Sequence, residues 1–427
     1  MRRGSIQGPG ERSLVLRAAT AQALVMGATT MLRPLRDALA AGGGQARLPW
    51  LFTASFLGVV IAAPLIAHAA ARLGRARLVG VIYGVSALVL VALWIGLQGP
   101  ARGRFAELFF VWISVFNLVT VSLLWSVLVD RLGPGAASRL FGLIAIGASA
   151  GAILGPAIAA AVATTLGADA LLLIAAGCLA LLVPVLGPLL RGGDGGEALG
   201  GSAFDGIRQL ARSPRLLRIA AYVALMSGTA TVLYFEQEAI VAARFVDDDA
   251  RTAALAGVEL AVNALALLLQ GLCTGPWLTR LGLRSALVLL PLVSAAGLGL
   301  VGAAPAWWAL VVAQVSRRTA DYALARPARE VLFTAVDRSA RYKAKGIIDT
   351  VVYRGGDALV GWGFLALSGL GLGLGGIAWA ALPLVALWGL VGWHLGGPTR
   401  GEGGATRGEG APEEGDDGAS PGPSEPR

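Results

Sequence analysis

The chain has 427 residues, of which 56% are hydrophobic and only 14% are charged, and its mean hydropathy is +0.70. A soluble domain carries about 25% charged residues, so this chain has too little charge to cover a soluble surface. The same hydrophobicity excludes disorder as the main state. The composition therefore predicts a protein that crosses a membrane several times.

Most kinds of enzyme site are excluded by what the sequence lacks. Two cysteines and two histidines are too few for a zinc site or a disulfide framework. There is no G-x-x-x-x-G-K-[ST] loop, so the chain does not hydrolyse ATP as a P-loop pump does. We therefore expect no enzyme activity, no cofactor, no metal and no nucleic-acid ligand.

Apolar runs of helical length recur along the chain. A bilayer core of about 30 Å needs about 20 apolar residues per helix. Twelve runs meet this length, and they lack the alternation of membrane β-strands. The predicted spans are 14–38, 49–72, 78–98, 105–129, 139–163, 168–190, 216–242, 253–276, 283–303, 305–325, 346–368 and 374–396.

The longest connection divides these runs into two sets. We expect an N-terminal six-helix half at 1–190, a cytoplasmic linker at 191–215 and a C-terminal six-helix half at 216–397. The segment 398–427 is acidic and rich in Gly and Pro, which predicts a disordered tail. The fold class is thus an all-α membrane protein with twelve transmembrane helices in two halves, the layout of major facilitator transporters.

The distribution of cations predicts the orientation. With the N-terminus in the cytoplasm, the inner connections and the N-terminal end carry 19 Lys and Arg, and the outer connections carry five. Both termini are therefore expected in the cytoplasm of a bacterial inner membrane. The lipid bilayer is the expected surrounding, and no obligate protein partner is evident.

The fifth run carries Gly147, Gly151 and Gly155, spaced by four residues. Such a stripe of small residues lets two membrane helices approach closely. We expect this face to pack against a neighbouring helix.

The pattern Arg-Pro-x-Arg-acid occurs twice, at 33–37 near the end of the first run and at 326–330 directly after the tenth. In a major facilitator fold, spans 1, 4, 7 and 10 lead the four triplets of helices and line the central cavity. Proline frees backbone groups there, and each acid can hold an adjacent arginine in the empty carrier. A salt bridge at a loop edge or snorkelling to headgroups is the alternative.

Charges inside apolar runs are costly, so they mark cavities or partners. The eighth run also contains Glu259. Guanidinium groups match carboxylate and phosphate oxygens, which predicts an anionic small-molecule substrate. The candidate substrate-binding residues are Arg33, Arg36, Tyr234, Arg317, Tyr322, Arg326 and Arg329. The candidate gating or coupling residues are Asp37, Glu236, Glu238, Asp321, Glu330, Arg354 and Asp357, and a local pair is the simpler interpretation of the last two.

Five stretches carry a family resemblance, at 32–37, 139–156, 233–237, 325–334 and 341–357. They resemble the ATP/ADP translocases, the nucleotide exchange transporters of plastids and intracellular bacteria, and especially their shorter relatives in free-living bacteria. The resemblance implies a major facilitator-like fold that exchanges ADP for ATP. Arg36 and Arg329 fall where the exchangers carry bases, whereas Asn117 and Tyr234 stand near the places of the family's acids in spans 4 and 7.

Three functions remain open. The first is ATP:ADP antiport, with arginines on the phosphates and Tyr234 or Tyr322 stacked on the base. The second is transport of another organic anion or proton-coupled export, in which Glu236, Glu238 or Asp321 carries the proton. The third is a sensor or scaffold that uses the acidic tail for docking.

Overall fold

The computed structural model describes residues 9–190, 208, 210–334 and 344–397. Residues 191–207 and 209 of the predicted linker and the whole predicted tail, 398–427, lie outside these ranges. Within the described ranges the chain is helical and contains no strand. Ten of its helices are long and apolar enough to cross a membrane, which confirms the predicted all-α membrane architecture.

In the N-terminal half, two predicted spans run together in one helical segment. The helices are α1 (Pro9–Gly43), α2 (Leu48–Arg72), α3 (Arg75–Leu97), α4 (Arg102–Thr165) and α5 (Ala170–Leu190). A straight helix of 64 residues would extend ~96 Å. However, Arg102 at the start of α4 is bonded to Asp169 just beyond its end, at 2.6 Å. The chain therefore reverses direction within α4, between the candidate spans 102–129 and 140–165.

The C-terminal half contains helices interrupted by π-helical turns. Its α-helices are α7 (Pro214–Arg244), α8 (Asp248–Leu269), α9 (Gly275–Arg280), α10 (Gly282–Ala303), α11 (Trp307–Ala320), α12 (Arg326–Thr334), α14 (Tyr353–Gly369), α15 (Leu374–Ala380) and α16 (Leu382–Leu395). Its π-helical segments are η2 (Gln270–Thr274), η3 (Asp321–Ala325) and η4 (Ile348–Val352).

Two predicted spans, 305–325 and 346–368, are not among the ten apolar helices. The chain is still helical there, as α11–η3–α12 and as η4–α14. Each of the two stretches carries several charged residues, which lower its hydropathy.

The glycine stripe of α4 packs directly on α1. A Cβ atom at Gly147 would overlap the backbone of Ala19, and a Cβ atom at Gly151 would overlap the backbone of Ala23. A Cβ atom at Gly155 would lie 2.6 Å from the carbonyl oxygen of Gly27. The prediction of close helix packing on this stripe is confirmed, and its partner is the helix that carries Arg33.

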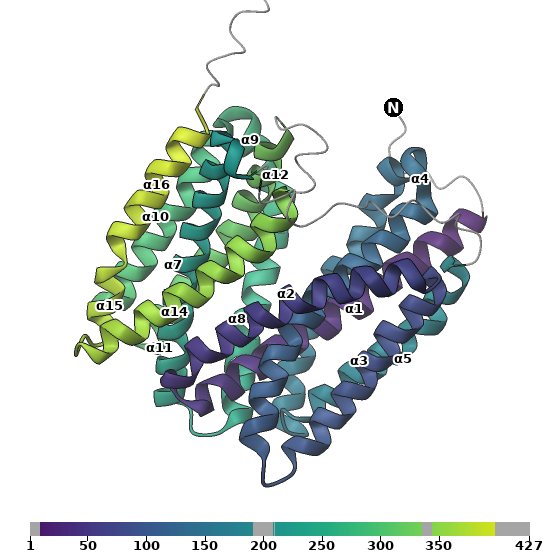
Figure 1. Cartoon of the computed structure of the whole chain (residues 1–427), viewed down its shortest axis with the longest axis horizontal. Helices are drawn as coiled ribbons and strands as arrows, with labels where there is room; N and C mark the ends of the chain where they lie inside the picture. Colours follow the sequence, from purple (N-terminus) through teal and green to yellow (C-terminus); the bar gives the residue numbers. More distant parts are fainter. Residues whose placement is uncertain (1–8, 191–207, 209, 335–343, 398–427) are drawn as a thin grey trace, which may run out of the picture.

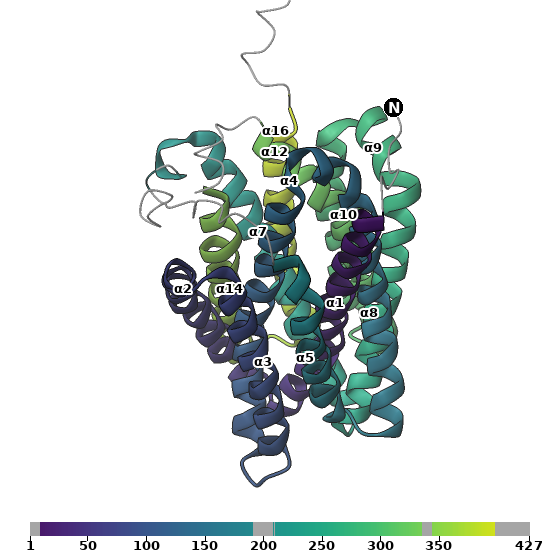
Figure 2. The same ribbon diagram turned by 90° about the vertical axis from the view of Figure 1, so that its right-hand side faces the viewer.

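The two halves meet at one end of the bundle and diverge toward the other, where α1 begins (Figure 1). We call the end formed by residues 44–47, 98–101, 166–169 and 245–247 the distal end. Both views place α1 beside α8 of the other half (Figure 2). The halves also touch where α2 packs on α14 and α4 packs on α8.

Candidate functional site

One buried carboxylate joins the two halves near the middle of their helices. Glu259 of α8 accepts a bond from Nη1 of Arg33 on α1 at 2.6 Å and from Nη2 of Arg318 on α11 at 2.5 Å. The Glu259 side chain is 3% exposed. Asn263, one turn further along α8, donates to the same carboxylate at 3.2 Å. Two helices of one half and one of the other are thus fixed on a single anion.

Tyr322 of η3 extends this arrangement. Its hydroxyl accepts bonds from Arg33 at 3.2 Å and from Arg318 at 3.1 Å. The guanidinium carbon of Arg326 lies 4.2 Å from the centroid of the Tyr322 ring, a cation–π distance. The two Arg-Pro-x-Arg-acid motifs therefore meet on one tyrosine.

Asp321 is the partner of the second motif. Its carboxylate lies 3.3 Å from Nε of Arg326 and 3.7 Å from Nη2 of Arg329. The predicted pairing of Arg329 with the adjacent Glu330 does not occur, because Glu330 binds Lys345 at 2.6 Å. We refer below to the arginine cluster, which comprises Arg33, Arg318, Arg326 and Arg329 with Glu259, Asp321 and Tyr322.

Arg317, the fifth candidate cation near the cluster, is half-buried. In the described part of the chain its Nε has no hydrogen-bond partner. The cluster and Arg317 together hold five guanidinium groups against two carboxylates. This surplus is what an anionic ligand would neutralise.

The backbone around Tyr322 depends on side chains of span 8. Pro327 has no N–H, so it cannot donate to the carbonyl of Ala323 four residues earlier. Thr274 of η2 donates its hydroxyl to that carbonyl at 2.7 Å. Gln270 of η2 donates to the carbonyl of Tyr322 at 2.9 Å. The two π-helical segments thus support each other, as predicted for proline in a membrane helix whose freed groups find partners.

The first motif forms a second centre with its own acid. Arg36 binds Asp37 through Nε at 2.7 Å, and Asp37 also accepts the hydroxyl of Tyr234 from α7 at 2.9 Å. The guanidinium carbon of Arg36 lies 5.1 Å from the ring centroid of Phe110 and 5.8 Å from that of Tyr234. Arg36 is therefore enclosed between aromatic rings of both halves.

The two candidate glutamates of α7 are buried with few partners. Glu236 is 0% exposed, and neither of its carboxylate oxygens has a hydrogen-bond partner among the described residues. Glu238 accepts one bond from Gln237 at 3.3 Å, and Gln237 in turn accepts one from Gln314 of α11 at 2.8 Å. In the part that the structure describes, no bond joins these acids to the arginine cluster.

The last candidate pair belongs to the packing of α7 on α14. Asp357 accepts the hydroxyl of Thr231 at 2.9 Å, whereas Arg354 lies 4.0 Å away. The local pair is thus present only at the limit of an ion pair. The bond to Thr231 is the shorter contact.

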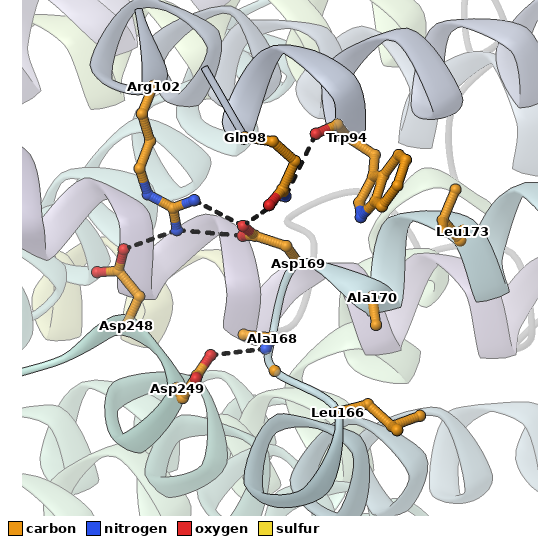
Figure 3. Close-up of a pocket in the computed structure, with 11 residues that line it drawn as sticks. Trp94, Gln98, Arg102, Leu166, Ala168, Asp169, Ala170, Leu173, Asp248 and Asp249 are labelled. Atoms are coloured by element: carbon orange, nitrogen blue, oxygen red, sulfur yellow. Dashed lines mark hydrogen bonds and ion pairs between the residues drawn. The ribbon is translucent and has the colours of Figure 1, made fainter. Parts of the chain in front are cut away.

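A separate polar network closes the distal end. Arg102 binds Asp169 of its own half at 2.6 Å and Asp248 of the other half at 3.0 Å (Figure 3). These residues line a pocket of about 470 Å³ that also includes Gln98 and Asp249. The carboxylate of Asp247 caps the start of α8 by accepting the N–H of Ala250 at 2.7 Å, which sets Asp248 and Asp249 in the first turn.

Glu259 stands out in the sequence as an acid inside an apolar run, but no local pattern assigns it a role, and the distal network was not predicted. No family model matches the chain, and no curated protein matches it. Among solved structures it is similar to a mutant form of the nucleoside transporter NupG (TM-score 0.63, 14% identity, 90% of this chain and 99% of that one).

The chain is also similar to a D-xylose-proton symporter (TM-score 0.62, 16% identity, 92% and 99% covered) and to the human organic anion transporter MFSD10 (TM-score 0.57, 18% identity, 90% and 100% covered). At such low identities the likeness concerns the fold, and it extends over nearly the whole of each structure. The fold of this chain is therefore the all-α, two-half membrane fold of the major facilitator type.

Proposed function

We propose that this protein is a secondary active transporter that carries an organic anion by alternating access. The observation that carries this proposal is the meeting of Arg33 and Arg318, from opposite halves, on Glu259. A site shared by two halves changes its exposure when the halves move relative to each other. The surplus of guanidinium groups around it favours a substrate with carboxylate or phosphate groups.

The contacts at the distal end support the assignment of this structure to one conformation of the transport cycle. The cation count in the sequence puts that end outside the cell. The form in which Arg102 holds Asp248 is then the inward-facing carrier, and the outward-facing form requires that this bond break.

For the substrate we propose nucleotides, exchanged as ATP against ADP. Triphosphate groups offer several oxygens for the guanidinium forks of Arg33, Arg318 and Arg326, and the resemblance to nucleotide exchangers points the same way. Exchange has a physical rationale as well. An empty site with a cationic surplus repels itself in a low dielectric, so the loaded carrier changes conformation more easily than the empty one.

Uptake into proteoliposomes tests this function. We expect saturable uptake of radiolabelled ATP only when unlabelled ADP or ATP is inside. The double variant Arg33→Ala, Arg326→Ala should abolish it. Arg47→Ala is the matched control, because Arg47 pairs with Glu107 on an exposed surface at 2.8 Å. Absence of nucleotide uptake by folded protein would exclude nucleotides and leave other organic anions as the substrate class.

Proton-coupled export is a second candidate, favoured by one observation. A buried carboxylate without partners, as at Glu236, is far cheaper to hold protonated than charged. Transport driven by an imposed pH gradient, and lost in Glu236→Gln, would support this mode. Transport that ignores the gradient would exclude it.

A further inference from the structure

We infer that Glu259 is an internal counter-anion of the carrier, which occupies Arg33 and Arg318 when no substrate is bound and is displaced from them by the transported anion. This inference rests on the proposed function, since it assumes that an anion enters the arginine cluster. It goes further by naming the group with which the substrate competes.

The Glu259 carboxylate is shared by two arginines, and neither arginine binds it in a bidentate way. Each carboxylate oxygen accepts one arginine, Oε1 from Arg33 and Oε2 from Arg318. Among the described contacts, Arg33 makes both of its bonds through Nη1 and Arg318 makes both of its bonds through Nη2. Neither guanidinium therefore presents its two-nitrogen fork to Glu259. A phosphate or carboxylate that does receive the fork gains the stronger, bidentate contact.

Glu259 is the most buried of the three side chains and Arg33 is the most exposed, as displacement by an incoming anion requires. Side-chain exposure is 3% for Glu259, 17% for Arg318 and 29% for Arg33. The two arginines are thus more accessible to an incoming anion than the glutamate is. Asn263 keeps hold of the carboxylate at 3.2 Å, so Glu259 retains one hydrogen-bond donor after the arginines leave.

Competition between Glu259 and substrate for the two arginines also affects the connection between the halves. A buried ion pair gives little net stability, because desolvation of the charges offsets their attraction. Exchange of Glu259 for a substrate anion on the same arginines therefore costs less than leaving those arginines unpaired. It also joins α1 to α8 and α11, so its release by substrate loosens one connection between the halves. The empty carrier keeps that connection, which favours exchange over one-way movement.

The test is the variant Glu259→Gln, which keeps the shape and removes the charge. With purified protein in detergent, we expect it to bind ATP and inorganic tripolyphosphate with a roughly tenfold lower Kd than the parent, because two arginines have lost their anion. Exchange turnover should fall, because release is slower. A merely structural role predicts the opposite, weaker binding from misplaced arginines.

Two further variants serve as controls for the binding measurement on Glu259→Gln. Glu107→Gln removes the same charge from an exposed pair with Arg47 and should leave the Kd unchanged. Glu259→Asp keeps the charge on a side chain one methylene shorter, which cannot reach both arginines equally. Its Kd should fall between those of the parent and Glu259→Gln, and it serves alone if Glu259→Gln does not fold.

A measurement without substrate separates this inference from the proposed function. Spin labels at Leu166→Cys and Val246→Cys, on opposite halves at the distal end, are placed in a Cys178→Ala, Cys273→Ala background. We expect Glu259→Gln to broaden their distance distribution toward longer values. If the parent binds neither probe, nucleotide transport fails, but a broadened distribution still supports the bridge. An unchanged distribution overturns the inference. Where the parent binds a probe, unchanged or weaker binding of that probe by Glu259→Gln also overturns it.

Discussion

Arg102 and Asp248 lie on opposite halves of the molecule and are joined by an ion pair of 3.0 Å at the distal end. Arg102 is held in place by Asp169 of its own half, and Asp248 is held by Arg251 of its own half at 3.1 Å. Both partners of the bond that joins the halves are thus fixed before they meet. This arrangement makes the bond a latch for one conformation.

Arg102→Gln should release this latch. Loss of a partly exposed ion pair costs up to ~1 kcal/mol, which corresponds to a roughly fivefold shift between two conformations. The spin-label pair at Leu166→Cys and Val246→Cys should report a larger population with long distances. Arg47→Gln is the control, because it removes the same charge from a pair within one half at the same end. Equal effects of the two variants would contradict the latch.

Tyr322 combines a ring and a hydroxyl, and two variants separate their roles. Tyr322→Phe keeps the ring under Arg326 but removes the hydroxyl that accepts from Arg33 and Arg318. It should weaken apparent substrate affinity by about 1 kcal/mol. Tyr322→Leu should lose a further ~0.5–2 kcal/mol with the cation–π contact. Transport kinetics measure both, and Tyr83→Phe, whose hydroxyl binds Thr120 within the N-terminal half at 2.8 Å, should leave affinity unchanged.

The contact between α1 and α4 can be tested with single methyl groups. Gly151→Ala places a Cβ atom against the backbone of Ala23 and should cost about 1–3 kcal/mol through overpacking. Gly142→Ala, on the same arm of α4, meets no atom within 4 Å and should be neutral or slightly stabilising. The midpoint of thermal unfolding in detergent distinguishes them. Similar midpoints would show that α1 and α4 separate at little cost.

The support of η3 by span 8 predicts a coupled pair of substitutions. Thr274→Val removes the hydroxyl that satisfies the carbonyl of Ala323 and should cost about 1–3 kcal/mol. Pro327→Ala restores an N–H that can serve that carbonyl instead. The double variant should therefore lose less stability than Thr274→Val alone. Additive losses in thermal unfolding would rule out this account of the freed carbonyl.

The positions of the spans follow from the sequence because the bilayer sets the length of each apolar run. The glycine stripe of α4 was also predictable, since spacing by four residues is a local property of one helix. The helix that packs against this stripe was not predictable, because residues 147–155 do not indicate that it is α1. The helical stretches with Arg317 and Arg354 were predicted by length, although their charges keep them below the hydropathy of the other spans.

The candidate site was predictable in composition but not in pairing. Pairing each arginine with the acid next to it in the sequence is right for Arg36, which binds Asp37. It is wrong for Arg329, which lies beside Asp321 of η3, while Glu330 binds Lys345. In the sequence, Glu259 is an acid inside an apolar run, and this feature does not distinguish it from Glu236 or Glu238. Its partners lie 226 and 59 residues away in the chain, and no local spacing encodes such distances.

The π-helical segment η3 stands between Arg317–Arg318 and Arg326–Arg329 and has a mechanical consequence. A π turn holds one residue more than the α turn it replaces. If the π turn moved along the helix past Arg329, the residues that it passed would rotate by about 100°. Arg326 and Arg329 would then be re-aimed away from Tyr322 and Asp321 while Arg318 stayed in place. Such a shift would turn Arg326 and Arg329 without unwinding the helix and without moving Arg317 and Arg318.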